Sequence, residues 1–443
     1  MNDGETVSAE LIERELSQEP TRTVRVLADR KATRQVITAF GGNFAIARFG
    51  DRDAYDSVGA HVLKNMPVGH ARIGIPLKTF IKASGDNYDA GHTSVKDVFR
   101  LMETFRDLKI PLVASIWDVP DHCVTNPEAT TGRRIAPDKR DKVIAAIAEW
   151  LRLGRERHGL TVPYISFNGA DSGENILLPP EEARYFITRG GAAIQKLGFP
   201  TKWLLGDTSN GESLVPYVTA IMSDKSVVPY LGPVSFHAWD SLTASDDSYR
   251  LIAKAARLYR HPVWCLETGY DAQLGKSDPP IWNTWDHAFK LAQSYARCLT
   301  LAEASVMDYW QYQNDFPIAD ADTEEPFPAF HMLRLYAQTF PAETQIVSAK
   351  VMGDCIYAVV GVEPEAGQLR VLLLNTGGPA NVVVSGGQPR AAYLRVDLDR
   401  TRAETRQVSH DSPIAEGTAY HTDDTGLVSL EMLPRTVTVF LEQ

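Results

Sequence analysis

The chain has 443 residues, of which 44% are hydrophobic and 23% are charged, as is ordinary for a globular protein with a sizeable core. Its formal net charge is −11, whereas binding to a phosphate backbone rests on clustered lysine and arginine. Four cysteines in so long a chain, without CxxC spacing, indicate neither a disulfide framework nor a zinc site. The composition therefore argues against a nucleic-acid partner.

The N-terminal segment, residues 1–20, is polar and acidic and contains no apolar signal-peptide core. We expect it to be flexible, and we expect the chain as given to be cytoplasmic. No stretch approaches the ~18 apolar residues of a membrane span, so we expect no membrane association. Residues 21–30 start with the alternating run TRTVRVLAD, which predicts a strand that joins a C-terminal sheet.

Residues 31–338 carry short apolar runs that alternate with amphipathic helical patterns. The runs cover residues 36–45, 70–77, 111–120, 164–171, 201–210, 232–240, 261–271 and 306–315. Eight such runs predict an α/β fold, a (β/α)8 barrel of parallel strands. A doubly wound open sheet is the alternative, and the lack of a GxGxxG turn after any run weakens it.

Residues 339–443 differ in character from the barrel region. Runs such as LRVLLLNTG and TVTVFL are short, rich in β-forming residues and separated by Gly, Pro, Asn and Asp, with no helical stretch between them. This pattern is typical of an antiparallel β-sandwich, which we expect as an accessory domain.

The candidate site residues come from the strand ends, because the active sites of such barrels lie at the C-terminal ends of the strands. We select the following candidates: Asn43, Arg72, Trp117, Asp118, Asn168, His237, Trp239, Glu267 and Trp310. Aromatic faces suit the C–H faces of sugars, and paired carboxylates cleave glycosidic bonds. The set predicts a glycoside or oligosaccharide substrate. HxH, HExxH and GxSxG motifs are lacking, and we expect no metal and no cofactor. Asp207 and Gln311 also stand at strand ends, without an assigned role.

The strand-end motifs occur in an order that resembles the clan A retaining glycoside hydrolases, most closely family 30. These motifs are AFGGNFA, HARIGIPL, SIWDVP, ISFNGAD, SFHAW, PVWCLETG, DYWQY and the terminal LPRTVTVFLEQ. The resemblance spans most of the chain from about residue 22. It implies a barrel with a side β-sandwich built from both termini, and retaining cleavage of O-glycosidic bonds through a glycosyl-enzyme.

The resemblance also implies roles for single residues. Glu267 matches the nucleophile, and Arg72 matches an arginine that keeps the nucleophile ionised. Asn168 matches the asparagine that holds the sugar 2-hydroxyl, and His237 a hydrogen-bonding residue beside it. Trp310 matches the platform beneath the reacting sugar, and Trp117 looks like a further wall.

Position 169 departs from the pattern, because Gly169 stands where the clan has its acid/base glutamate. The resemblance then implies an acid/base-deficient glycosidase with impaired turnover. Several alternatives stay open. In the first, Asp171 or Glu174 takes over as the acid, either in a retaining or in an inverting enzyme. In a second alternative, the barrel binds carbohydrate without cleaving it. In a third alternative, Gly169 is required because the backbone forms a turn with a positive φ at this position.

Overall fold

A computed structural model describes residues 22–44, 57–83, 88–277, 280–312, 316–404 and 417–443. The expected flexible segment, residues 1–20, lies outside these ranges. By packing, the chain divides into two compact units. One unit consists of Met1–Ile37, Asn283–Ala296 and Phe327–Gln443, and the other of Thr38–Trp282 and Arg297–Pro326. The domain limits expected from the sequence stay a prediction.

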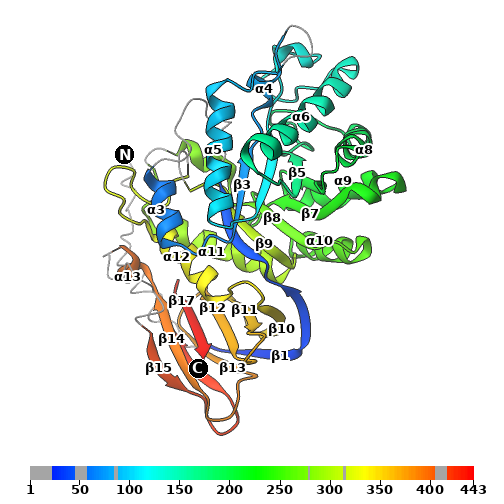
Figure 1. Cartoon of the computed structure of the whole chain (residues 1–443). Coiled ribbons are helices and arrows are strands. Elements are labelled where there is room, and N and C mark those ends of the chain that lie inside the picture. The colour runs from blue at the N-terminus through cyan, green and yellow to red at the C-terminus, as the bar shows by residue number, and fades with distance from the viewer. Residues whose placement is uncertain (1–21, 45–56, 84–87, 278–279, 313–315, 405–416) are drawn as a thin grey trace, which may run out of the picture. The chain divides into compact units, whose positions relative to one another are not determined.

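The second unit contains a closed barrel of eight parallel strands, which confirms the predicted fold class (Figure 1). Its strands are β2 (Ala39–Asn43), β3 (His70–Gly74), β4 (Leu112–Ile116), β5 (Tyr164–Phe167), β6 (Lys202–Thr208), β7 (Leu231–His237), β8 (Val263–Thr268) and β9 (Ala304–Tyr309). The barrel closes where β9 pairs with β2, in the register Gly41 to Asp308. Six of the strands lie within the predicted apolar runs, whereas β7 begins one residue and β9 two residues before its run.

Helices follow the barrel strands in the chain, as the alternation predicts. They are α3 (Ser57–Asn65), α4 (Leu77–Phe80), α5 (Thr93–Asp107), α6 (Arg140–His158), α7 (Pro180–Tyr185), α8 (Gly191–Lys196), α9 (Gly211–Met222), α10 (Asp246–Tyr259), α11 (Trp285–Thr300) and α12 (Pro328–Thr339). Helix α5 shows why they form: Val98, Leu101, Met102 and Phe105 are buried along one face at helical spacing. Short helical turns include η1 (Asp121–Cys123), η2 (Pro137–Lys139), η3 (Phe186–Gly190), η4 (Lys225–Tyr230) and η5 (Ala272–Lys276).

The first unit contains a nine-stranded, mostly antiparallel sheet. Its strands are β1 (Arg22–Val36), β10 (Gln345–Met352), β11 (Ile356–Val362), β12 (Leu369–Asn375), β13 (Ala380–Ser385), β14 (Ala392–Leu398), β15 (Thr418–His421), β16 (Val428–Met432) and β17 (Val437–Glu442), and α13 (Arg400–Glu404) lies between two of them. The sheet curls around one apolar core that includes Val26, Leu373, Val382, Leu430 and Phe440. The predicted β-sandwich is confirmed in this form.

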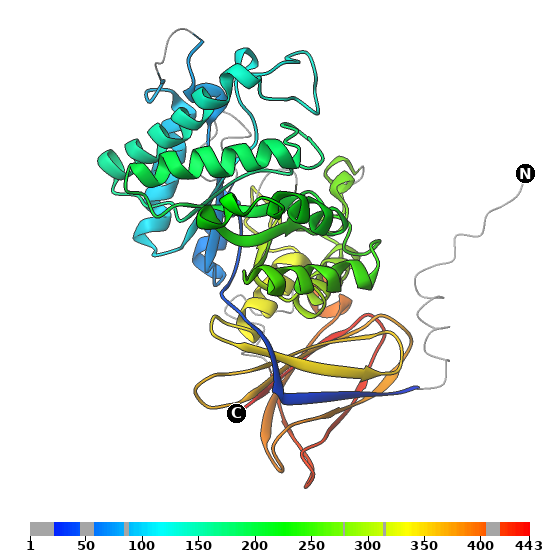
Figure 2. The same ribbon diagram turned by 90° about the vertical axis from the view of Figure 1, so that its right-hand side faces the viewer.

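Strand β1 is the N-terminal contribution to this sheet (Figure 2). Val26 pairs with Val351 of antiparallel β10 and with Val384 of parallel β13. The strand is therefore inserted between two strands that lie more than three hundred residues later in the chain. It also continues to Val36, beyond the alternating run that predicted it. In the described ranges, no helix has both the length and the apolar character that a membrane crossing requires.

Candidate active site

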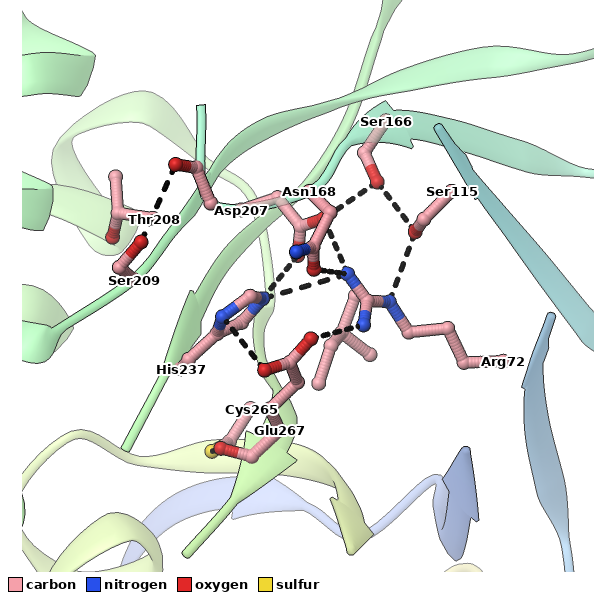
Figure 3. A network of polar contacts seen from close by, with 12 residues as sticks. Arg72, Ser115, Ser166, Asn168, Asp207, Thr208, Ser209, His237, Cys265 and Glu267 are labelled. Atoms are coloured by element: carbon pink, nitrogen blue, oxygen red, sulfur yellow. Dashed lines mark hydrogen bonds and ion pairs between the residues drawn. The ribbon is translucent and has the colours of Figure 1, made fainter. Parts of the chain in front are cut away.

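Arg72 lies at the centre of the polar network at the C-terminal ends of the barrel strands (Figure 3). Its guanidinium is fully buried, and Nη1 donates to Glu267 Oε1 at 2.6 Å and to Asn43 Oδ1 at 3.0 Å. Nη2 donates to Asn168 Oδ1 at 2.7 Å and to Asp207 Oδ2 at 2.9 Å. One side chain therefore connects residues from β2, β6, β8 and the end of β5.

Two carboxylates share this one buried cation. Burial alone would lower the pKa of Arg72, but the negative charges of Asp207 and Glu267 outweigh it and raise the pKa above its usual value. Burial likewise opposes the ionisation of Asp207. The charge of Arg72 and hydrogen bonds from His237 and Ser166 nevertheless hold the pKa of Asp207 well below its usual range. Asp207 is therefore a permanent anion at neutral pH.

Glu267, near the end of β8, is 3% exposed. While its Oε1 accepts from Arg72, its Oε2 accepts from Trp239 Nε1 at 3.0 Å and lies 3.2 Å from His237 Nδ1. The other ring nitrogen of His237, Nε2, lies 3.3 Å from Asp207 Oδ1. The imidazole therefore sits between the two carboxylates, and the orientation of Glu267 is fixed from three sides.

Serine and asparagine side chains tie this network to the barrel backbone. Asn43 Nδ2 donates to the carbonyl oxygens of Leu266 and Tyr309, at 2.8 and 3.0 Å. Ser115 Oγ accepts from Arg72 Nε at 2.9 Å and lies 2.8 Å from Ser166 Oγ, which donates to Asp207 Oδ2 at 2.6 Å. Neutral donors and acceptors thus form hydrogen bonds with the charged groups, which lowers the free-energy cost of burying them.

Strand irregularities turn some of these side chains toward the network. The pairing of β6 with β7 shifts between Gly206 and Thr208, and Asp207 between them has a φ of 58°. The pairing of β7 with β8 shifts just before His237. Bulges of this kind redirect side chains next to active sites. Asp207 and His237 therefore depend on local departures from regular strand geometry.

A row of aromatic side chains lies beside the carboxylates. The ring centroids are 6.4 Å apart for Trp117 and Trp310, 6.0 Å for Trp310 and Trp239, 5.4 Å for Trp239 and Phe316, and 4.7 Å for Phe316 and Trp282. Trp239, in the middle of this row, also donates to Glu267, so the row passes beside the carboxylate. We call these five residues the aromatic row.

The candidate binding residue Asp118 and the two alternative acids, Asp171 and Glu174, have other environments. Asp118 forms ion pairs with Lys78 at 2.9 Å and with Arg133 at 2.5 Å. Asp171 Oδ1 accepts from the backbone N–H of Ser209 at 2.8 Å, and its Oδ2 accepts from the hydroxyl of Ser213 at 2.6 Å. Glu174 is exposed to solvent. The other eight strand-end candidates meet at the Arg72 network or in the aromatic row.

Gly169 lies directly after Asn168 in a turn with a φ of 51°. Its N–H donates to the carbonyl of Asp207 at 3.0 Å, and its own carbonyl accepts from the N–H groups of Ser172 and Gly173, each at 3.2 Å. A Cβ at position 169 would lie 2.7 Å from Ser209 Oγ. The backbone here has the left-handed conformation that glycine adopts without steric cost.

Asp207, Ser115 and Ser166 belong to the network, although no role is predicted for them from sequence. For Asp207 the sequence contains a signal that could have predicted a site residue, because Asp207 is a carboxylate at the end of a predicted strand. Ser115 and Ser166 stand two residues before Trp117 and Asn168, and strand alternation places such residues on the same face. In the described part of the chain, no group of three His, Cys, Asp or Glu residues is placed to hold a metal ion.

Comparison with protein-family models gave no match, and neither did comparison with curated proteins. Solved structures are similar over nearly the whole chain. A family 30, subfamily 8 xylanase from Clostridium acetobutylicum is 15% identical, with 95% of this chain and 99% of that chain covered and a TM-score of 0.72. A family 30 endoxylanase from Clostridium papyrosolvens is 14% identical (95% and 100% covered, TM-score 0.71), and a family 39 enzyme from Xanthomonas axonopodis pv. citri is 13% identical (96% and 98% covered, TM-score 0.64). The fold of this chain is therefore that of the clan A glycoside hydrolases of the family 30 type, as the order of its motifs implies.

Proposed function

We propose that this chain is a retaining glycoside hydrolase whose nucleophile is Glu267. The observation that carries the proposal is the ion pair between Glu267 Oε1 and Arg72 Nη1, at 2.6 Å and almost fully buried near the end of β8. A cation in this position stabilises the negative charge that an attacking carboxylate needs. The similar structures include xylanases, which supports a carbohydrate substrate for this chain as well.

In the first step, a Glu267 oxygen attacks the anomeric carbon, and the bond between that carbon and the aglycone oxygen breaks. The product is a glycosyl ester of Glu267. Arg72 and Trp239 hold the carboxylate in one orientation, which reduces the entropy lost in reaching the transition state. Trp310 and Trp117 provide flat faces for the sugar ring.

Asn168 is set up to bind a sugar hydroxyl. Its carbonyl oxygen accepts from Arg72 Nη2 at 2.7 Å. Because this contact fixes which way the amide points, the NH₂ group is directed away from Arg72 and is suited to donate to a substrate hydroxyl. This orientation supports the 2-hydroxyl contact that the family resemblance implies.

In the second step, water attacks the same carbon and releases Glu267. With Gly169 at the acid/base position, no side chain there protonates the departing oxygen or deprotonates the water. General acid–base catalysis is worth roughly 10²- to 10⁴-fold in rate. The proposed enzyme therefore turns over ordinary glycosides slowly.

Glu267→Gln tests the proposal, with the exposed Glu156→Gln as a matched control. On 2,4-dinitrophenyl glycosides of xylose and glucose, the Glu267 variant should lose dinitrophenol release and the control should keep it. NMR of the first sugar released should show the substrate's own anomeric configuration. Release of the opposite anomer would support the inverting alternative with Glu174 or Asp171 instead.

A carbohydrate-binding barrel without catalysis is the second candidate, and Gly169 is the feature that favours it. The two candidates differ in one measurement. A binding protein retains sugar affinity in both the original chain and Glu267→Gln, and it releases no dinitrophenol in either.

A further inference from the structure

The loop that follows β7 is bound to the end of β8 at three points. The N–H of Ala238 donates to the carbonyl oxygen of Glu267 at 2.9 Å. The hydroxyl of Ser241 donates to the carbonyl oxygen of Gly269 at 3.1 Å. Between these two loop residues, Trp239 Nε1 donates to the carboxylate of Glu267 at 3.0 Å. The loop therefore cannot move relative to β8 without breaking these hydrogen bonds.

Gly269 provides the space in which the indole of Trp239 lies. A Cβ at position 269 would lie 2.2 Å from Cζ3 and 2.6 Å from Cε3 of Trp239, and its three nearest atoms all belong to this ring. The φ of Gly269 lies outside the left-handed region, so the backbone itself would accept an alanine. A side chain at position 269 would therefore push the ring, and with it Nε1, out of its present position.

Asp240, the residue after Trp239, is fixed by two helices. Its Oδ1 accepts from the N–H of Gly211 at 3.0 Å and from the hydroxyl of Tyr249 at 2.9 Å, and its Oδ2 accepts from the N–H of Glu212 at 3.0 Å. Gly211 and Glu212 begin α9, where backbone N–H groups lack a partner within the helix, and Tyr249 is a fully buried residue of α10. The carboxylate thus ties the backbone next to the indole to two rigid elements.

We propose that Asp240 and Gly269 are positioning residues that act on Glu267 through the indole of Trp239. Asp240 fixes the backbone from which the indole projects, and Gly269 leaves the room that brings Nε1 to the carboxylate. This inference rests on the proposed function, because it concerns the reactivity of the nucleophile. A displacement of about 1 Å can cost roughly 10²-fold in rate, so small movements of the indole should be measurable in kinetics.

Gly269→Ala tests the contact with the indole. It should slow dinitrophenol release from 2,4-dinitrophenyl glycosides of xylose and glucose by roughly 10- to 100-fold, as expected for the loss of one hydrogen bond to a charged group. The loss should lie in kcat with little change in KM, since the variant keeps every aromatic ring. A loss confined to KM would overturn the inference, because the glycine would then only shape the binding surface.

A double-mutant cycle with Trp239→Ala shows whether the glycine acts through the indole. The crowded ring is absent from the Trp239→Ala variant, so the addition of Gly269→Ala should change kcat by less than about twofold. A full loss in that background would overturn the inference, because position 269 would then affect Glu267 by another route.

Asp240→Ala provides a second test that does not depend on the folding of Gly269→Ala. It removes all three contacts to α9 and α10, so kcat should fall by roughly tenfold or more in the original chain but not in Trp239→Ala. Asp240→Asn should recover most of the activity, because an amide oxygen can still accept from Gly211 and Tyr249. No recovery, or an equal loss without the indole, would overturn the role of Asp240.

Ser245→Ala is the matched control, because it also removes a helix cap. Ser245 is exposed, and its hydroxyl oxygen accepts from the N–H of Ser248 at the start of α10, at 3.1 Å. This variant should lose some stability to urea, as capping variants do, while its kcat stays that of the original chain. A loss of kcat equal to that of Asp240→Ala would assign the effect to helix capping alone and contradict the inference.

Labelling of Glu267 by a fluorosugar separates this inference from the proposed function. A labelled Glu267 in the original chain, together with an unchanged kcat in Gly269→Ala and Asp240→Ala, overturns only the positioning roles. No label and no dinitrophenol release from either sugar overturns the proposed function, and the positioning roles with it.

Discussion

Arg72 and Asp207 form an ion pair at 2.9 Å in which neither side chain has exposed surface. The same guanidinium holds Glu267, so the geometry of the proposed nucleophile depends on a charge pair inside the barrel. Removing one member of a buried pair leaves the other charge without compensation, which costs far more than losing a surface pair.

Asp207→Asn should lower the free energy of unfolding by about 3–5 kcal/mol, because Arg72 then lacks one of its two anions. Urea denaturation at neutral pH measures this. Asp247→Asn is the control, since Asp247 pairs with Arg250 at 2.9 Å but is 88% exposed, and its loss should have little effect. Equal effects of the two substitutions would show that the Arg72–Asp207 pair does not stabilise the fold.

His287→Gln should flatten the dependence of stability on pH. Burial lowers the pKa of His287 to about 4, whereas an unfolded histidine has a pKa of about 6.5. As pH falls, the unfolded chain takes up this proton first. The contribution of His287 to the free energy of unfolding is therefore fully present above pH ~6.5. It declines as pH falls toward ~4, by roughly 3 kcal/mol in all.

Urea midpoints between pH ~7 and ~4 measure this decline in the original chain and in the variant. The exposed His421→Gln is the control and should follow the original chain. A His287→Gln variant whose midpoints fall as steeply as those of the original chain would contradict the assignment.

Gly169→Ala should destabilise the chain more than Gly198→Ala. Both glycines have positive φ, at 51° and 74°, which costs an L-residue roughly 1–2 kcal/mol. A Cβ at position 198 has nothing within 4 Å, whereas one at 169 lies 2.7 Å from Ser209 Oγ. Because Ser209→Ala removes the crowding atom, the double variant Gly169→Ala/Ser209→Ala should recover the difference. Thermal or urea unfolding of the four variants tests this, and equal losses at 169 and 198 would exclude crowding.

Trp239→Phe should slow dinitrophenol release by roughly 10- to 100-fold while sugar binding stays close to that of the original chain. The substitution keeps an aromatic ring but removes the Nε1–H that donates to Glu267 Oε2 at 3.0 Å. A hydrogen bond to a charged group contributes roughly 1.5–3 kcal/mol. A lower kcat with little change in KM identifies a positioning role. A higher KM with unchanged kcat would show that Trp239 only stacks on the substrate.

The barrel could be predicted from the sequence because its signal is local. Eight β-rich runs followed by helical patterns identify the strands one at a time, and closure then brings their ends together. This is why Arg72, Asn168, His237 and Glu267, chosen only as strand-end residues, meet in one network.

Other features depend on contacts between distant segments or on backbone details. Asp207 joins the network through a bulge and a positive φ, which alternation alone does not predict. Asp118 is also a carboxylate at a strand end, yet it forms ion pairs with Lys78 and Arg133 and does not join the Arg72 network. Likewise, neither the sequence of β1 nor that of β13 contains a pattern that predicts their parallel pairing.

Covalent trapping of the glycosyl-enzyme shows whether Glu267 is the nucleophile. The chain is incubated with 2,4-dinitrophenyl 2-deoxy-2-fluoro-glycosides of xylose and glucose, digested, and examined by peptide mass spectrometry. We expect a fluorosugar ester on Glu267, formed with release of one dinitrophenol per chain and lost in Glu267→Gln. An ester on Asp171 or Glu174, or dinitrophenol release without any labelled peptide, would contradict it.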